Sequence, residues 1–110
     1  MSPKHKPLAW LEGEVKTPPF SGPARLEAGY LLRLLQAGQR LRMPHSRPMP
    51  SIGPRCHELR IVDAGKTWRL IYRIDPDAIV VAGIFAKKTA ATPYPIVNAC
   101  RGRLKDYDDA

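Results

Sequence analysis

Basic side chains stand inside three segments that otherwise have the apolar pattern of β-strands. The segments are residues 56–61, 68–73 and 84–89. Arg60, Arg69 and Lys88 come from consecutive strands or strand ends, so antiparallel pairing through two short turns can bring them to one surface. Three cations held that close repel one another unless something anionic binds there. Taken alone, each is more simply explained as a solvated strand residue, but together they predict a site for a phosphate-bearing ligand.

His57 and Glu58 are neighbours in the first of these strands, so their side chains point to opposite faces. Glu58 lies two residues before Arg60 and therefore shares its face. Its carboxylate stays ionised beside cations, which suits a general base or an ion-pair anchor for Arg60, and the ion pair is the simpler interpretation. His57 is a proton shuttle or, as we favour, a half-buried residue at the strand start. Arg73 is interpreted as a surface charge or a partner of Asp75.

Tyr94 is the aromatic residue with a candidate role outside the core. It lies in the first turn of a helix that Thr92 and Pro93 are expected to start. From that place a phenol can stack on a base or donate a hydrogen bond to a phosphate, or its ring can instead pack on Pro95 and the sheet. The strand aromatics Trp68, Tyr72 and Phe85 are expected in the core.

The composition indicates one folded domain that spans residues 1–110. Hydrophobic residues make up 44%, and 18 Lys and Arg against 10 Asp and Glu give a net charge of +8. This charge favours nucleic acid, an acidic protein or an anionic membrane as partner. A membrane partner is not expected because no apolar run approaches twenty residues, so the expected location is cytoplasmic. Cys56 and Cys100 are expected to be free thiols, and neither a metal nor a cofactor is implied, since the three histidines are scattered.

Local patterns predict the order of elements along the chain. They are a strand within residues 6–16, a helix from residue 21 or 22 to Gly38, an extended basic loop over residues 41–54, three antiparallel strands, and a helix that starts at residues 92–93. Four prolines in the loop argue against both helix and ladder pairing there. Turns at residues 64–66 and 75–77 separate the three strands, and residues 106–110 form a short acidic tail.

Several motifs in this order resemble the RelE/ParE superfamily of toxins from bacterial type II toxin–antitoxin systems, and specifically the phage-derived branch related to HigB. The matching segments are residues 6–11, 16–21, 46–50, 58–61, 68–69, 72–73, 85–89 and 92–93. The resemblance implies a small α+β, RelE-like fold, with a twisted antiparallel sheet, a long helix in the N-terminal half and a C-terminal helix, both packed on one side. It also implies cleavage of messenger RNA, usually at codons in the ribosomal A site.

The resemblance implies roles for particular residues. The catalytic set is Glu58, Arg60, Arg69, Lys88 and Tyr94, and the RNA-binding set is Arg47, Arg55, His57, Arg73 and Lys87. Arg69 and Lys88 match phosphate-stabilising cations, and Tyr94 matches a stacking tyrosine. Glu58 is an acid where the family carries a base, which leaves the proton-transfer role open. Attack by the ribose 2′-OH on its own 3′-phosphate needs cations on the phosphorane and no metal. We expect toxicity to fall steeply with Arg69→Ala or Lys88→Ala while the melting temperature stays nearly constant.

The resemblance leaves other functions open. A ParE-like inhibitor shares the fold, binds DNA gyrase and cuts nothing, but such inhibitors lack the set formed by Arg60, Arg69, Lys88 and Tyr94. A basic binding module that acts only as corepressor is a third possibility. A toxin requires a cognate antitoxin, and the resemblance implies one with a helix-turn-helix domain. Operator DNA is then contacted only through the antitoxin, and the target is mRNA on the ribosome.

Overall fold

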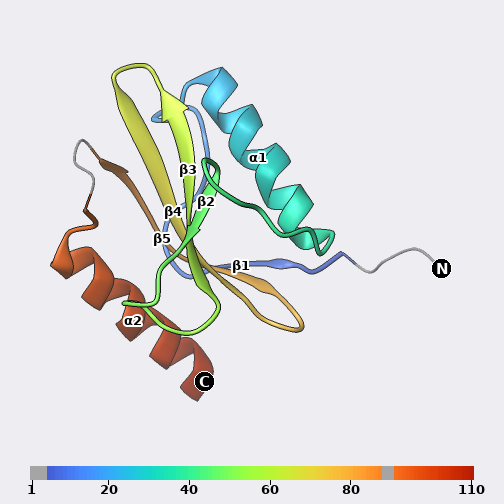
Figure 1. Cartoon of the computed structure of the whole chain (residues 1–110), viewed down its shortest axis with the longest axis vertical. Coiled ribbons are helices and arrows are strands. Elements are labelled where there is room, and N and C mark those ends of the chain that lie inside the picture. Colours follow the sequence, from blue (N-terminus) through green and yellow to red (C-terminus); the bar gives the residue numbers. More distant parts are fainter. Residues whose placement is uncertain (1–4, 88–90) are drawn as a thin grey trace.

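The computed structural model describes residues 5–87 and 91–110 and contains one five-stranded sheet with a helix on each face (Figure 1). The elements in chain order are β1 (Leu8–Trp10), α1 (Gly22–Gln36), β2 (Ser46–Pro48), β3 (Cys56–Asp63), β4 (Lys66–Ile74), β5 (Ile79–Lys87) and α2 (Tyr94–Asp109). Across the sheet the strand order is β1-β5-β4-β3-β2. The structure thus confirms the expected α+β class.

Helix α1 has the boundaries that its sequence signals predict. The Ser21 hydroxyl accepts a hydrogen bond from the backbone N–H of Ala24 (3.1 Å), and a proline occupies the first turn. After the helix ends, Gly38 takes a φ of +90°, which glycine adopts without steric cost. The backbone N–H groups of Gly38 and Gln39 donate to the carbonyls of Leu35 and Leu34, so the end of α1 is closed by its own chain.

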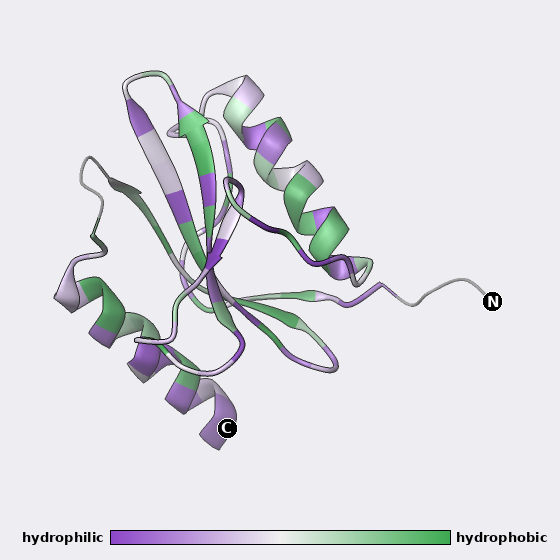
Figure 2. Ribbon diagram, viewed as in Figure 1, coloured by the Kyte–Doolittle hydropathy of each residue, from purple (hydrophilic) through white to green (hydrophobic). Residues whose placement is uncertain are grey.

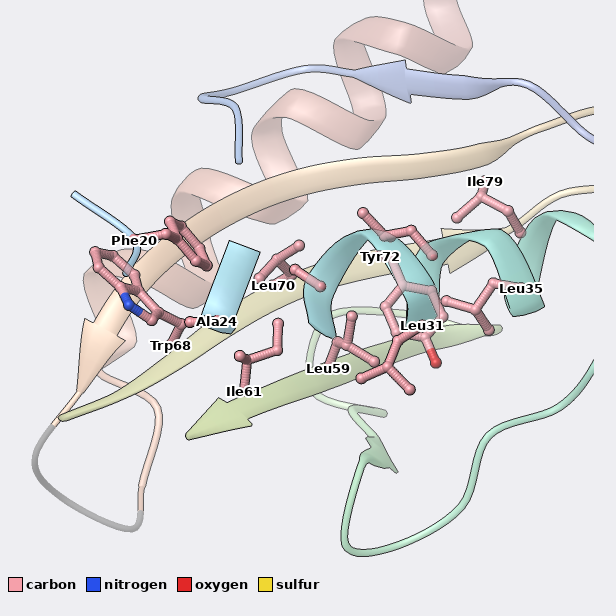
Figure 3. Packing of buried hydrophobic residues seen from close by; sticks show 12 residues of the cluster. Phe20, Ala24, Leu31, Leu35, Leu59, Ile61, Trp68, Leu70, Tyr72 and Ile79 are labelled. Atoms are coloured by element: carbon pink, nitrogen blue, oxygen red, sulfur yellow. The ribbon is translucent and has the colours of Figure 1, made fainter. Parts of the chain in front are cut away.

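The main core lies between α1 and one face of the sheet (Figure 3). Leu59 and Ile61 of β3 and Leu70 and Tyr72 of β4 point toward α1 because alternate residues of a strand share a face. Trp68 continues this row, and its ring stacks on Phe20 with 4.1 Å between centroids. Trp68 and Tyr72 are therefore core residues as predicted.

Helix α2 covers the other face. Its buried residues Val97, Cys100 and Leu104 pack on Ile71 and Val80 of the sheet. Gly83 permits this approach, because a Cβ at that position would lie 2.8 Å from the Cys100 sulfur. The expectation that both helices pack on one side is wrong: the strands have apolar residues on both faces, and each face needs a cover. Cys56 and Cys100 are both free and buried.

Two pairings differ from the sequence-based expectation. Strand β1 pairs with β5 in parallel, with Leu8 opposite Ile79, so the sheet is mixed rather than wholly antiparallel. Within the stretch expected to be a loop, β2 pairs with β3 antiparallel. Pro48 is compatible with this pairing because β2 is an edge strand, where a missing N–H costs no ladder bond.

Hydrophilic residues interrupt strands that otherwise consist mainly of apolar residues (Figure 2). On the face that α2 covers, β3 presents Glu58 and Arg60 beside Arg69 and Arg73 of β4, as the cross-strand register requires. In the part of the chain that the structure describes, neither helix is long and apolar enough to cross a membrane.

Candidate functional site

A buried carboxylate joins four elements on the α2 face of the sheet. Glu58 is fully buried, and it accepts hydrogen bonds from the Arg69 guanidinium of β4, from Arg47 Nε of β2 (3.1 Å) and from Thr92 Oγ1 just before α2 (2.8 Å). Arg60 lies two residues further along β3 on the same face. We call Glu58, Arg47, Arg60, Arg69 and Thr92 the Glu58 cluster.

The Glu58 carboxylate is held in its ionised form. Burial alone raises the pKa of a carboxyl group, but the hydrogen bonds from Thr92 and Arg69 and the charges of Arg69 and Arg47 hold the pKa of Glu58 below its usual value. A carboxylate with three donors and a lowered pKa is a weak proton acceptor. The ion pairs of Glu58 in the described residues are with Arg69 and Arg47, whereas the sequence suggested Arg60 as its partner.

The cluster carries more positive than negative charge. Arg60 and Arg69 are directly opposite each other in the β3–β4 ladder, an arrangement that is destabilising for like charges. Arg69 is only 4% exposed, whereas Arg60 is partly exposed. The Nε atoms of both arginines are buried, and within residues 5–87 and 91–110 neither has a hydrogen-bond partner. Donors with unused capacity beside surplus positive charge form a site that an anion can complete.

Tyr94 is close in sequence to the Glu58 cluster. It is the first residue of α2, two residues after Thr92, and it is 71% exposed. The exposure leaves the ring accessible for stacking rather than buried against the sheet. Of the two candidate lysines, Lys87 ends β5 and its side chain is not described, and Lys88 lies outside the described residues.

His57 and Arg55 lie away from the Glu58 cluster. The His57 imidazole leaves the opposite face of β3 and stacks on Tyr72, with 5.3 Å between ring centroids and 19° between the ring planes. Burial and the nearby Arg40 charge lower the pKa of His57, so the ring is neutral at pH 7. Arg55 is exposed, has a φ of +62° and lies 3.6 Å from the Asp75 carboxylate.

Arg73 is enclosed by two carboxylates. It donates from Nε and a terminal nitrogen to Asp75 (2.7 and 2.9 Å) and from both terminal nitrogens to Asp108 of α2 (2.9 and 2.6 Å). The hydrogen bonds and charges of these partners raise the pKa of the Arg73 guanidinium further. The pairing with Asp75 agrees with one of the two interpretations from the sequence, while a surface position is wrong because Arg73 is buried. We call Arg73, Asp75, Asp108 and Arg55 the Arg73 cluster.

Two contributors to these clusters were not recognised in the sequence as such. Thr92 was expected to cap α2, but the helix has no side-chain cap, and the hydroxyl donates to Glu58 instead. Asp108 was assigned to an acidic tail, yet it lies within α2 and binds Arg73. Nothing in the sequence around Thr92 or Asp108 indicates these distant partners: Thr92 precedes a proline, and Asp108 is one of several acidic residues near the C-terminus.

The fold and the Glu58 cluster define a small basic α+β protein with a surplus of arginine charge on one sheet face. Residues 19–105 match the family of phage-derived Gp49-like proteins (DUF891), so the chain belongs to this family. It is a phage-derived, toxin-like family often found in toxin–antitoxin systems. No curated protein and no solved structure shows significant similarity to the chain. Among the described residues, no group of three or more His, Cys, Asp or Glu is placed to hold a metal ion.

Proposed function

We propose that this protein is the toxin of a type II toxin–antitoxin system and acts as a metal-independent, ribosome-dependent mRNA endoribonuclease that arrests translation in the cytoplasm. The observation that carries the proposal is the Glu58 cluster, in which Arg47 and Arg69 share one carboxylate, Arg60 lies opposite Arg69, and two buried Nε atoms have no partner among the described residues. Membership in a toxin-like family supports the biological setting.

The proposed reaction uses the RNA's own nucleophile. The ribose 2′-OH attacks the adjacent 3′-phosphate, the bond from phosphorus to the 5′-oxygen breaks, and the products are a 2′,3′-cyclic phosphate and a 5′-hydroxyl. The phosphorane between them carries two negative charges, and guanidinium donors stabilise it. Arg60, which is partly exposed, contacts the phosphate in this proposal, and Lys88 is the second cation. Arg69 is buried, so in this proposal it does not contact the RNA; it is a positioning residue whose charge adds to the positive potential at Arg60.

Glu58 has a different role in this proposal from that of a general base. Because three donors hold it ionised, it orients Arg69 and Arg47 and offsets part of their charge. His57 leaves the opposite face of β3 and takes no part in proton transfer. The rate enhancement then comes from orientation of the 2′-OH and from charge stabilisation.

The outer contacts of the RNA are assigned to neighbouring residues. Tyr94 offers an exposed ring on which a base can stack, and Arg47 reaches the same side from β2. A cognate antitoxin neutralises the toxin through an acidic or amphipathic segment that complements the net charge of +8. Its helix-turn-helix domain contacts operator DNA, which the toxin reaches only through it.

Primer extension on mRNA after induction tests the nuclease proposal. We expect discrete breaks with the wild-type protein and a loss of about 100-fold or more in cleavage with Arg60→Ala, the magnitude typical of removing one transition-state donor. Arg25→Ala is the matched control, because Arg25 is an exposed arginine of α1 on the other side of the sheet. Unchanged cleavage by a folded Arg60→Ala protein would contradict the proposal.

A ParE-like inhibitor of DNA gyrase is the second candidate. One observation favours it: the ionisable acid of the cluster, Glu58, is buried and fully engaged, so it supplies no free general base. A supercoiling assay with purified gyrase separates the two functions. Intact mRNA together with arrested gyrase would replace the nuclease proposal with this one, whereas active gyrase and broken mRNA would exclude the inhibitor.

A further inference from the structure

A basic cavity lies at one end of the sheet, on the side that α1 covers. Its volume is about 370 Å³, within the range of about 300–1,000 Å³ that is usual for small-molecule sites. It is formed where the C-terminal end of α1 meets the turn between β4 and β5 and the start of β3, close together in Figure 1. The polar residues that line it are Lys6, Gln39, Arg40, Arg55, His57 and Asp75.

The charge of this cavity favours an anion. Lys6, Arg40 and Arg55 contribute three positive charges. Asp75 is the negative residue of the lining, and its carboxylate accepts two hydrogen bonds from Arg73 and lies 3.6 Å from Arg55, so Lys6 and Arg40 carry the surplus charge. The surplus charge of the lining is therefore positive, which favours an anionic ligand.

The free carbonyls at a helix C-terminus carry partial negative charge and would repel an anion. At the end of α1 this repulsion is reduced, because the carbonyls are hydrogen-bonded. Its last four carbonyls, from residues 33 to 36, all accept backbone hydrogen bonds. The donors are the N–H groups of Ala37, Gln39, Gly38 and Lys6. The N–H of Lys6 donates to the Gln36 carbonyl, and the Gln36 side chain donates back to the Lys6 carbonyl (2.9 and 2.8 Å). This reciprocal pair anchors the backbone of Lys6 at the rim of the cavity.

The cavity also contains a flat ring. His57 is neutral at pH 7, and its stacking on the buried Tyr72 defines the plane of the imidazole. Aromatic rings beside cations are the elements with which proteins bind unpaired nucleotides, the cations on the phosphate and the ring against the base. Gln39 adds an amide that can both donate to and accept from a base edge.

We propose that this cavity binds one phosphorylated nucleotide unit, with Lys6, Arg40 and Arg55 on the phosphate and His57 against the base. The unit is either a nucleotide of an RNA strand or a free mononucleotide, since both present the same chemistry. The site is separate from the Glu58 cluster, because His57 and Glu58 leave opposite faces of β3. The inference goes beyond the proposed nuclease and holds whether or not RNA is cut.

Fluorescence anisotropy with a labelled single-stranded RNA octamer tests the site. All variants are made in the Arg60→Ala background, so that the probe is not cleaved and contacts at the Glu58 cluster are weakened equally. We expect Lys6→Ala with Arg40→Ala to weaken binding about tenfold near physiological salt and to reduce the salt slope by about 0.7, the contribution of one neutralised phosphate on a single strand. The matched control is Arg25→Ala with Arg33→Ala, which removes two exposed arginines of α1.

The control and a second probe decide the interpretation. An equal loss in both double variants would show that net charge alone binds RNA and would overturn the proposal, as would no loss in either. Titration of ¹⁵N-labelled protein with adenosine monophosphate identifies the source of the ligand. Amide shifts of Gly38, Gln39 and Arg40 that saturate with the mononucleotide support a free-nucleotide site, and shifts there with the octamer alone support an RNA-strand site. Shifts confined to other residues with both probes would overturn the site.

Discussion

Two ion-pair clusters are built on side chains from the same face of the sheet, and they have opposite charge balance. The Glu58 cluster has three arginines and one carboxylate, which pairs with Arg47 and Arg69, and two of its buried Nε atoms have no partner among the described residues. The Arg73 cluster sets Arg73 and the more distant Arg55 against Asp75 and Asp108, and all three nitrogens of Arg73 donate to carboxylates. One cluster therefore carries surplus positive charge, while the other is neutral.

A buried arginine is therefore not by itself a functional signal. Arg69 and Arg73 stand four residues apart on one strand and share a face, and both are less than a tenth exposed. What distinguishes them is the count of carboxylates within reach. An arginine with two acidic partners ties elements together, whereas arginines that share one acid keep unused donors and surplus charge.

The largest effect is expected from Glu58→Ala. Removal of this carboxylate leaves the buried Arg69 guanidinium without its counter-charge, so the free energy of unfolding should fall by about 3–5 kcal/mol. Urea denaturation followed by circular dichroism measures the loss. Glu58→Gln is the matched variant, because it keeps the volume and removes the charge, and it should be destabilised to a similar degree. A loss in Glu58→Ala alone would assign the effect to packing.

The burial of Arg69 changes one expectation drawn from the sequence. We expected Arg69→Ala to lose toxicity without a change in melting temperature, but an arginine that is 4% exposed and bound to Glu58 should lower stability when truncated. Arg60, which is partly exposed, is the residue whose removal separates activity from stability. Lys88→Ala is still expected to lower toxicity steeply at a nearly constant melting temperature.

Arg73→Met tests the neutral cluster. Its removal leaves Asp75 buried without its main partner, so stability should fall by about 3 kcal/mol, the low end for a broken buried pair, because Asp108 is half-exposed and can rehydrate. The same urea experiment applies, with Arg55→Met as control, expected to cost under about 1 kcal/mol because Arg55 is exposed. If cleavage by the folded Arg73→Met protein fell as far as in Arg60→Ala, the two clusters would not differ in function.

The elements governed by local pattern were predictable from the sequence. The serine cap and proline of α1, the alternation in β4 and the turn at Gly65, with its φ of +74°, all depend on neighbours within a few residues. The alternation also placed Glu58 and Arg60 on one face and His57 on the other, as the ladder shows.

Contacts between distant residues were not predictable in the same way. Thr92 meets Glu58 across 34 residues of sequence and Arg73 meets Asp108 across 35, and no local pattern encodes such pairs. The pairing of β2 and the parallel pairing of β1 have the same cause, since both depend on where the sheet edges remain free. The position of one helix on each face of the sheet could have been inferred, because the strand sequences have apolar residues on both faces.

A smaller effect is expected from Thr92→Val, which keeps the shape and removes the hydroxyl that donates to Glu58. The lost charge-assisted hydrogen bond should cost about 1.5 kcal/mol, and the pKa of Glu58 should rise, because this bond helps to lower it. Urea denaturation measures the first effect and ¹³C NMR titration of the carboxyl the second. Thr67→Val, the same replacement at a partly exposed position of β4, should change stability by less than about 0.5 kcal/mol. An equal loss in both variants would show that Thr92 does not depend on Glu58.

The smallest effect concerns the pH dependence of the Arg73 cluster. The hydrogen bonds from Arg73 lower the pKa of Asp108 below its ordinary value of 3.8, so the pair stabilises the fold above that pH and loses its contribution as the pH falls through the folded pKa. The difference in urea midpoint between the wild type and Asp108→Asn should therefore be constant above about pH 5 and shrink below about pH 4. Taking the difference cancels the other carboxyl groups, which titrate in both proteins. A midpoint difference that stayed constant down to about pH 2 would mean that Asp108 is held by its shape and not by its charge, and the balance of two acids against two arginines would no longer explain why the Arg73 cluster is neutral.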